Sequence, residues 1–275
     1  MPRVRLNLDA LRIAGVPLGT PLLVAPRAWD SDVELPEEAP ETPEFIRPGL
    51  AFIDIRGPLD EEPDQMCGWW DGYAGEDGIA ARFERAANDP ATVAILIHFK
   101  TPGGTSAGII ECCKRMIAAR DAAGIPVIGW VTEACSAGYW LAMVCDGGLF
   151  GNEQANAGSI GSYIPHESIA ALLEKEGVVM TLVADPPGKT AGNPFEALSD
   201  VARSRLERGV KKCTGQFMAA VETARPELSE KVLRELDGDV LEGVDAVNAG
   251  LLDGVTDFET TIEMAFALAE ARKAA

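Results

Sequence analysis

Ser136 combines a reactive hydroxyl with a position in the chain that would expose it. It stands in the small-residue turn Cys135-Ser136-Ala137-Gly138, between a predicted buried strand and a predicted helix. Backbone N–H groups at the start of a helix can stabilise an oxyanion, so this arrangement suits a nucleophilic serine. A serine that only caps the helix would produce the same pattern, and the motif alone favours the cap.

A nucleophilic serine needs a base, and the chain contains 2 histidines. His98 lies inside an apolar run and is interpreted as a satisfied core residue. His166 lies in a loop or helix start and is interpreted as a surface residue. No GxSxG motif is followed by a histidine, which argues against an ordinary α/β-hydrolase triad.

Lysine is the alternative base, because burial can lower the pKa of a lysine amine and leave it neutral. Lys189 stands in the loop PPGKTAGNP, and Lys100 lies at a strand end beside glycines. An exposed lysine would explain either position equally well. Gly103 and Gly104 follow that strand and could direct backbone N–H groups outward as an oxyanion hole, or form an ordinary turn.

The composition is that of a folded domain rather than a disordered or fibrous chain. Of 275 residues, 47% are apolar and 24% are charged, and the net charge is −19. Such a charge repels nucleic acid and anionic lipid, so neither is an expected partner. The sequence shows no apolar stretch long enough to span a membrane and no secretory signal. The 6 cysteines have no zinc-ligand spacing, which predicts free thiols, a cytoplasmic location and no metal or cofactor.

Strands alternate with helices in the central part of the chain, which predicts an α/β fold with stacked βαβ units and a mainly parallel sheet. Continuous apolar runs are typical of strands that are covered on both faces. The predicted strands are residues 50–59, 93–99 and 125–131, and the predicted helices are 77–88, a segment ending near 120, and the second half of 132–146.

Towards the C-terminus the pattern becomes mainly helical. Residues 147–163 predict short strands and turns, 166–177 a helix, 178–184 a third strong strand, 186–194 a loop and 199–225 a long amphipathic helix, before a final alanine-rich helix. Residues 1–44 predict an arm with a short apolar segment and an acidic, proline-rich linker. The compact domain is therefore expected to span residues 45–275.

Five motifs in this order resemble the signal peptide peptidase A family of serine peptidases, on the fold shared with Clp protease and crotonases. They are VAILIHFKTPGG, VIGWVTEACSAGYWLAMVCD, NAGSIGSY, GKTAGNPF and GDVLEGVDAVNAGLLDGV, and the resemblance runs from about residue 50 to 258. The GKTAGNPF loop is most similar to cytoplasmic head-maturation (prohead) proteases of tailed phages.

The resemblance implies roles for individual residues. Ser136 matches the nucleophile, Lys189 the general base, and Ser159 a hydroxyl that helps to hold the lysine amine. The oxyanion hole would comprise Gly103 or Gly104 together with the N–H of Ala137. Many members carry Gly-Gly after the nucleophile where this chain has Ala-Gly, but alanine keeps its N–H. Many phage members also continue into a scaffold-like region, which is expected to be absent or separately encoded here.

A Ser/Lys endopeptidase that processes phage capsid, scaffold or portal proteins is the leading interpretation, and relatives that form closed rings imply a homo-oligomer. A housekeeping cytoplasmic peptidase for signal peptides or protein fragments is the alternative within enzymes. A crotonase-like acyl-CoA enzyme and an assembly protein without proteolytic activity are alternatives from other classes.

Overall fold

The computed structural model describes residues 22–24, 44–61, 66–68 and 78–274. Its larger sheet has the strand order β10-β9-β8-β6-β3-β2, with β11 pairing on β9. The four central strands run parallel, which confirms the predicted α/β class. The strands of this sheet are β2 (Glu44–Arg47), β3 (Leu50–Arg56), β6 (Ala94–Thr101), β8 (Val127–Cys135), β9 (Leu149–Gly158), β10 (Val240–Glu242) and β11 (Gly254–Val255).

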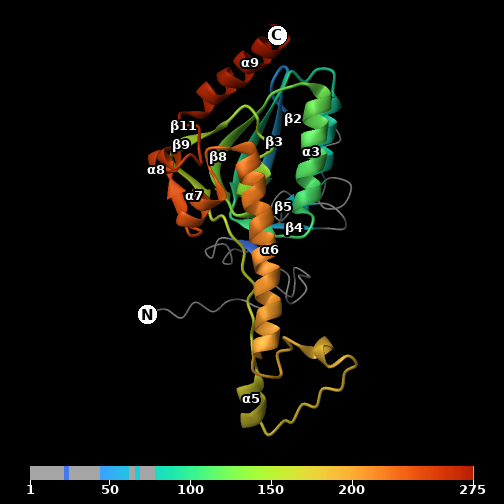
Figure 1. Ribbon diagram of the computed structural model, residues 1–275. Coiled ribbons are helices and arrows are strands. Elements are labelled where there is room, and N and C mark those ends of the chain that lie inside the picture. The colour runs from blue at the N-terminus through green and yellow to red at the C-terminus, as the bar shows by residue number, and fades with distance from the viewer. Residues whose placement is uncertain (1–21, 25–43, 62–65, 69–77, 275) are drawn as a thin grey trace.

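Helices cover both faces of this sheet, which is why its central strands are apolar on both sides. One face packs against α2 (Ile79–Asn88), α3 (Ile109–Ala123) and α4 (Ala137–Ala142). The other face packs against α9 (Phe258–Ala274), which crosses the end of the sheet in Figure 1. Along β6, successive residues alternate between these two cores, as the two-residue period of a strand requires.

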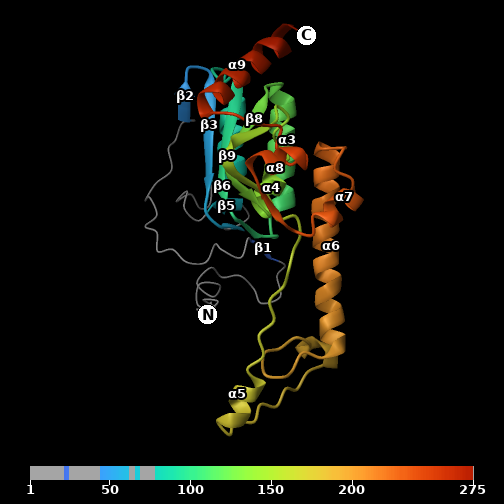
Figure 2. The same cartoon turned by 90° about the vertical axis from the view of Figure 1, so that its left-hand side faces the viewer.

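A smaller sheet with the order β1-β7-β4-β5 lies beside the end of β6. Its strand β7 follows β6 after a single residue, and β4 pairs with β7 in parallel. The strands are β1 (Leu22–Val24), β4 (Leu59–Glu61), β5 (Met66–Gly68) and β7 (Gly103–Thr105). Figure 2 labels β1 at the end of the main sheet from which the chain leaves towards α5.

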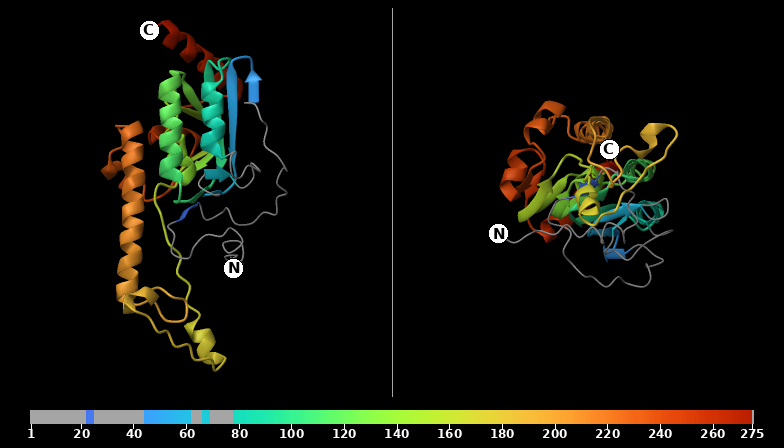
Figure 3. Two further views of the ribbon diagram at one scale, coloured as in Figure 1. Left: turned by 90° about the vertical axis from the view of Figure 1, so that its right-hand side faces the viewer. Right: turned by 90° about the horizontal axis from the view of Figure 1, so that it is seen from below.

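A long arm projects from the body of the molecule (Figures 2 and 3). We define the arm as residues 163–199 together with the N-terminal half of α6 (Asp200–Ala224). It contains α5 (Ala170–Lys175) and the short 3₁₀ helix η2 (Pro187–Thr190). Its outgoing and returning segments are joined by the Ile169 N–H, which donates to the Pro194 carbonyl at 2.8 Å. The helix α6 then carries the chain back to the body.

Two predictions for the segments around the arm were wrong. Residues 178–184 form no strand, and the side chains of Val179 and Val183 are 89% and 93% exposed. These residues are strand formers, but a strand needs a hydrogen-bonded neighbour, and the described part of this chain offers none there. Residues 147–163 do not form several short strands, because 149–158 make the single strand β9 between β8 and β10.

Contacts of Arg225 and Asp253 fix the end of α6 to the body. The guanidinium of Arg225, which is 9% exposed, donates to the Gly250 carbonyl at 2.9 Å and pairs with Asp253. Asp253 in turn accepts the N–H of Leu149 at 2.6 Å, at the start of β9. The three contacts hold the body end of α6 relative to the sheet. The remaining helices are α7 (Glu230–Glu235) and α8 (Gly243–Asn248).

The N-terminal segment and linker predicted over residues 1–44 lie almost wholly outside the described residues, as does the side chain of Cys67. Five cysteine side chains are described, and none of them is in a disulfide bond. Among the described helices, none is long and apolar enough to cross a membrane.

Candidate active site

Ser136 occupies a strained position between β8 and α4. Its φ of 53° and ψ of −119° lie where non-glycine residues are uncommon. Its N–H donates to the Gly158 carbonyl at 2.8 Å, which fixes the turn against the end of β9. Although Ser136 is the N-cap residue of α4, its side chain makes no capping hydrogen bond. Capping therefore does not account for the hydroxyl, and the sharp strand-to-helix turn is the type of backbone that presents a nucleophile.

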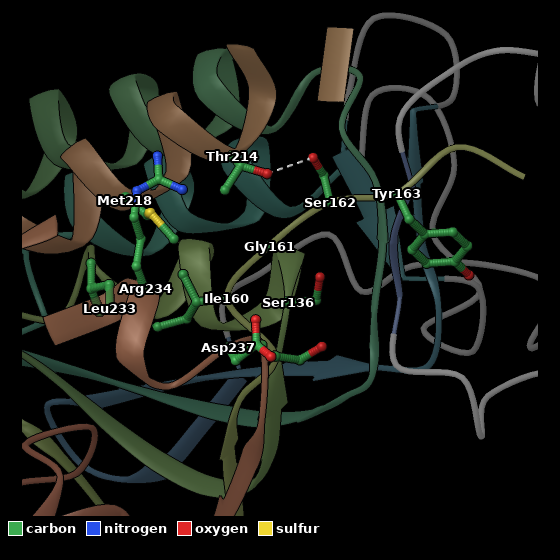
Figure 4. A pocket seen from close by; sticks show the side chains of 12 residues that line it. Ser136, Ile160, Gly161, Ser162, Tyr163, Thr214, Met218, Leu233, Arg234 and Asp237 are labelled. Atoms are coloured by element: carbon green, nitrogen blue, oxygen red, sulfur yellow. Dashed lines mark hydrogen bonds between the residues drawn. The ribbon is translucent and has the colours of Figure 1, made fainter. Parts of the chain in front are cut away.

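A pocket of about 450 Å³ opens beside Ser136 (Figure 4). It lies between the segment that follows β9, the middle of α6, and α7 with its following turn. Its walls combine an apolar part with hydroxyls and two charged residues at the rim. The lining residues are Ser136, Ser159, Ile160, Gly161, Ser162, Tyr163, Thr214, Met218, Leu233, Arg234, Asp237 and Gly238.

Hydrogen bonds and apolar packing hold the walls of this pocket together. The hydroxyl of Ser162 lies 2.9 Å from the Thr214 hydroxyl and donates to the Val210 carbonyl at 3.1 Å, which joins the segment after β9 to α6. Ile160 and Leu233 are 3% and 0% exposed and form the apolar wall. The position of α6 therefore sets the width of the pocket.

The predicted oxyanion glycines lie on β7, next to α4. Gly138 approaches Thr101 so closely that a Cβ on Gly138 would lie 2.4 Å from the Thr101 Cγ2. Thr101 in turn accepts the N–H of Gly103 at 3.1 Å. A Cβ on Gly104 would lie 1.8 Å from the Leu59 carbonyl oxygen, so only glycine allows β7 to approach β4 this closely. The structure thus places the glycine strand beside the helix that follows Ser136.

Ala137 and Ser159 also lie at the site. Ala137 is the first residue of α4, and a helix offers no internal acceptor to the N–H groups of its first turn. Ser159 has a φ of 55° and donates its N–H to the Asp239 carbonyl at 2.8 Å. Both serines, Ser136 and Ser159, line the pocket.

Neither candidate lysine lines this pocket. Lys189 is exposed on η2, near the end of the arm that is remote from the sheet (Figures 2 and 3). Lys100 is exposed on β6, opposite Arg56 on one neighbouring strand and Glu133 on the other. The structure therefore does not bring Lys189 to the Ser136 of the same chain.

The histidines differ from each other in their surroundings. His98 lies 2.9 Å from Asp54 through Nδ1 and 2.9 Å from the Thr132 hydroxyl through Nε2, which confirms it as a satisfied residue of the sheet. Burial raises the pKa of Asp54, but the hydrogen bond and charge of His98 and the charge of Arg56 outweigh it, so the pKa lies below its ordinary value. His166 is partly exposed, and its Nε2 is enclosed without a hydrogen-bond partner among the described residues.

The sequence prediction missed the residues that α6 and α7 contribute to the pocket. Thr214, Met218 and Leu233 belong to helices whose apolar spacing indicates packing but not what they pack against. No cluster of metal-ligating side chains occurs in the described ranges.

Comparison with known proteins gives a consistent result. The model of peptidase family S49 matches residues 119–272. Capsid assembly protease C of Escherichia phage lambda is 33% identical over 226 residues, which are 82% of this chain and 50% of that protein. Head-tail preconnector protein GP5 of Enterobacteria phage P21 is 30% identical over 78% of this chain and 42% of that protein. Protease 4 of Salmonella typhi is 28% identical over 74% of this chain and 32% of that protein. The chain thus spans half or less of the length of these relatives.

Among solved structures, a monofunctional enoyl-CoA isomerase from M. smegmatis aligns with a TM-score of 0.38 and 15% identity, over 84% of this chain and 83% of that one. An enoyl-CoA hydratase/isomerase family member aligns with a TM-score of 0.40 and 15% identity, over 83% of this chain and 74% of that one.

Proposed function

Because this chain belongs to peptidase family S49, we propose that it is a serine endopeptidase in which Ser136 is the nucleophile and Lys189 of a second copy is the general base. The observation that carries the proposal is the placement of Ser136. Its backbone is strained, its hydroxyl makes no capping bond, and a pocket opens beside it. Strained backbone of this kind is concentrated at functional sites.

No lysine or histidine is among the described residues that line the pocket, so we assign the base to a residue outside it. Arg234 is the basic residue among the described lining residues, and a guanidinium stays charged and cannot accept a proton. Lys189 is held on a structured loop, because the Arg205 guanidinium donates to the neighbouring Gly188 carbonyl and the Lys189 N–H donates to Pro186 at 2.9 Å. A lysine fixed at the end of a projecting arm suits delivery to another subunit.

The apolar surface of the arm supports a second copy as its partner. Seven of the nine large hydrophobic side chains exposed in the described part of the chain lie between residues 163 and 201. They include Val179 at 89% and Val183 at 93% exposure. Exposed apolar surface concentrated in this way marks an interaction site. If the arm packs on the body of a second copy, its segment 178–184, which is rich in strand-forming residues, gains a partner. The Lys189 amine would then be desolvated by this contact.

In this mechanism the neutral Lys189 amine takes the proton of the Ser136 hydroxyl while the Ser136 Oγ bonds to the scissile carbonyl carbon. The N–H groups of Ala137 and Gly104 stabilise the resulting oxyanion, since the Gly103 N–H already donates to the Thr101 hydroxyl oxygen. When the scissile C–N bond breaks, the protonated Lys189 amine donates this proton to the leaving amine. A water then attacks the acyl-enzyme with Lys189 as base again, and Ser159 helps to position the amine.

We assign phage head proteins as the substrate class, because the relatives include a protease named for capsid assembly and a head-tail preconnector protein. The test is co-expression of the chain with neighbouring capsid, portal and scaffold genes, followed by mass spectrometry of new protein termini. New termini should appear with the wild type and be absent with Ser136→Ala. Lys189→Arg should be as inactive as Lys189→Ala, since arginine cannot act as the base.

The same termini in the presence of Ser136→Ala would refute the assignment of the nucleophile. Full activity of Lys189→Arg would show that this lysine is not a base, and Lys100→Arg would then be measured in the same assay.

A further inference from the structure

Both edges of the glycine strand β7 are occupied by other strands of the same chain. One edge pairs in parallel with β4, through Leu59 and Gly104. The other edge pairs with β1 in antiparallel register, with Leu22 opposite Thr105, Leu23 opposite Gly104 and Val24 opposite Gly103. Residues 22–24 therefore fill an edge of β7 that would otherwise expose unpaired backbone groups.

That edge is where the backbone of a peptide substrate must run. The carbonyl attacked by Ser136 has to reach the N–H groups of β7 and of Ala137, and β4 blocks the opposite edge. An extended peptide beside β7 would gain main-chain hydrogen bonds by adding a strand to it. The Gly103 end of β7 is the end nearer to Ser136, because Thr101 lies against Gly138 in the turn after the serine.

The strand β1 has the direction that a bound substrate needs. It runs from Leu22 towards Val24, and hence towards Gly103 and the nucleophile. In this register Leu23 and Val24 stand opposite the two glycines of β7, so the residue with the attacked carbonyl would take one of these two positions. Leu22 precedes them.

We propose that residues 22–24 occupy the place of the substrate strand, so that the chain carries its own competitor for the active site. The proposal rests on the proposed function, since it takes Ser136 and the β7 glycines as the reacting centre. A peptide substrate then binds only after β1 has left β7. The apparent affinity for substrate is reduced by the fraction of molecules in which β1 is paired.

The test compares the full-length wild type with the double variant Leu23→Pro/Val24→Pro. Successive N–H groups of a strand point in opposite directions, so replacing two adjacent residues removes whichever one pairs with β7. If β1 is paired in nine molecules of ten, KM for an extended peptide should fall about tenfold while kcat stays unchanged. The matched control Ala28→Pro lies outside residues 22–24 and should keep the wild-type KM.

Hydrogen exchange provides a readout that does not depend on activity. In the Ser136→Ala background, whichever of the Gly104 and Thr105 amides faces β1 should be protected in the parent and exchange faster in the double proline variant. Unchanged exchange there, or an unchanged KM beside an active wild type, would overturn the proposal. Faster exchange in a protein that hydrolyses no peptide would instead show that the proposed function has failed.

The intact mass of the purified chain is measured first. A wild type cut after Leu23 or Val24, with Ser136→Ala left whole, would itself place this segment in the substrate position.

Discussion

Replacing Gly104 by alanine perturbs the closest backbone approach at the site. The added Cβ would lie 1.8 Å from the carbonyl oxygen, 2.4 Å from the carbonyl carbon and 2.5 Å from the nitrogen of Leu59. All three are backbone atoms, so no side-chain rotation can relieve the contact, and β4 and β7 must separate. Overpacking of this kind costs about 1–3 kcal/mol, occasionally more. For a chain of this size the melting temperature should then fall by about 2–12 °C.

The same displacement moves the β7 N–H groups away from the scissile carbonyl of the substrate, whose oxyanion they would stabilise. Loss of one oxyanion donor lowers kcat by about 10²- to 10³-fold, and a comparable loss is expected here. The assay combines thermal unfolding with peptide hydrolysis, and Gly215→Ala serves as the matched control. A Cβ on Gly215 has no atom within 4 Å, and in the interior of α6 alanine should stabilise by about 0.5–1 kcal/mol. A Gly104→Ala protein with parental stability and rate would refute the packing of β4 on β7 and the role of this strand.

Three further predictions concern the body of the fold. Arg225→Met should lower the free energy of unfolding in urea by about 1–3 kcal/mol, which is less than for a fully buried pair because water reaches the partly exposed Asp253. The control Lys231→Met removes one partner of an exposed pair and should change this free energy by at most about 0.5 kcal/mol. Equal losses in the two variants would contradict the anchoring role of Arg225. Because the pKa of Asp54 is lower in the folded than in the unfolded state, its carboxylate stabilises the fold above the unfolded pKa, and this stability is lost as the pH falls through the folded pKa. In Asp54→Asn the free energy of unfolding should therefore decline less steeply below about pH 4 than in the wild type. An unchanged pH dependence would argue against the Asp54–His98 contact. Burial raises the pKa of Cys112 to about 12, so its thiol should resist alkylation at pH 8 until the protein is unfolded. Peptide mapping after alkylation measures this, and rapid labelling of Cys112 in the folded protein would contradict its burial.

The sequence was sufficient to predict the parallel core and the turn at Ser136. Runs such as 93–99 and 125–131 are apolar on both faces, and that pattern depends only on local composition and burial. The segment 178–184 has the same composition but is exposed, because strand formation also requires a partner that composition cannot specify.

The pocket beside Ser136 could be predicted only in part. Ser136 and Ser159 line it, and each directly follows the end of a strand; strand ends of a parallel sheet lie together at one edge. Thr214 and Leu233 reach the pocket from helices far along the chain, and their position depends on how the Arg225 contacts set α6 against the body. The separation of Lys189 from Ser136 depends on the course of the arm, which motif order does not define.

The most direct test of the central claim is to mix two inactive variants, Ser136→Ala and Lys189→Ala, under conditions that allow subunits to exchange. If each site joins Ser136 of one copy to Lys189 of another, half of the sites have an intact serine and half of those receive an intact lysine, so an equimolar random mixture should recover about one quarter of wild-type peptide hydrolysis. Each variant alone should remain inactive. A mixture as inactive as its components, under conditions where exchange of labelled subunits is demonstrated, would contradict a dyad shared between copies.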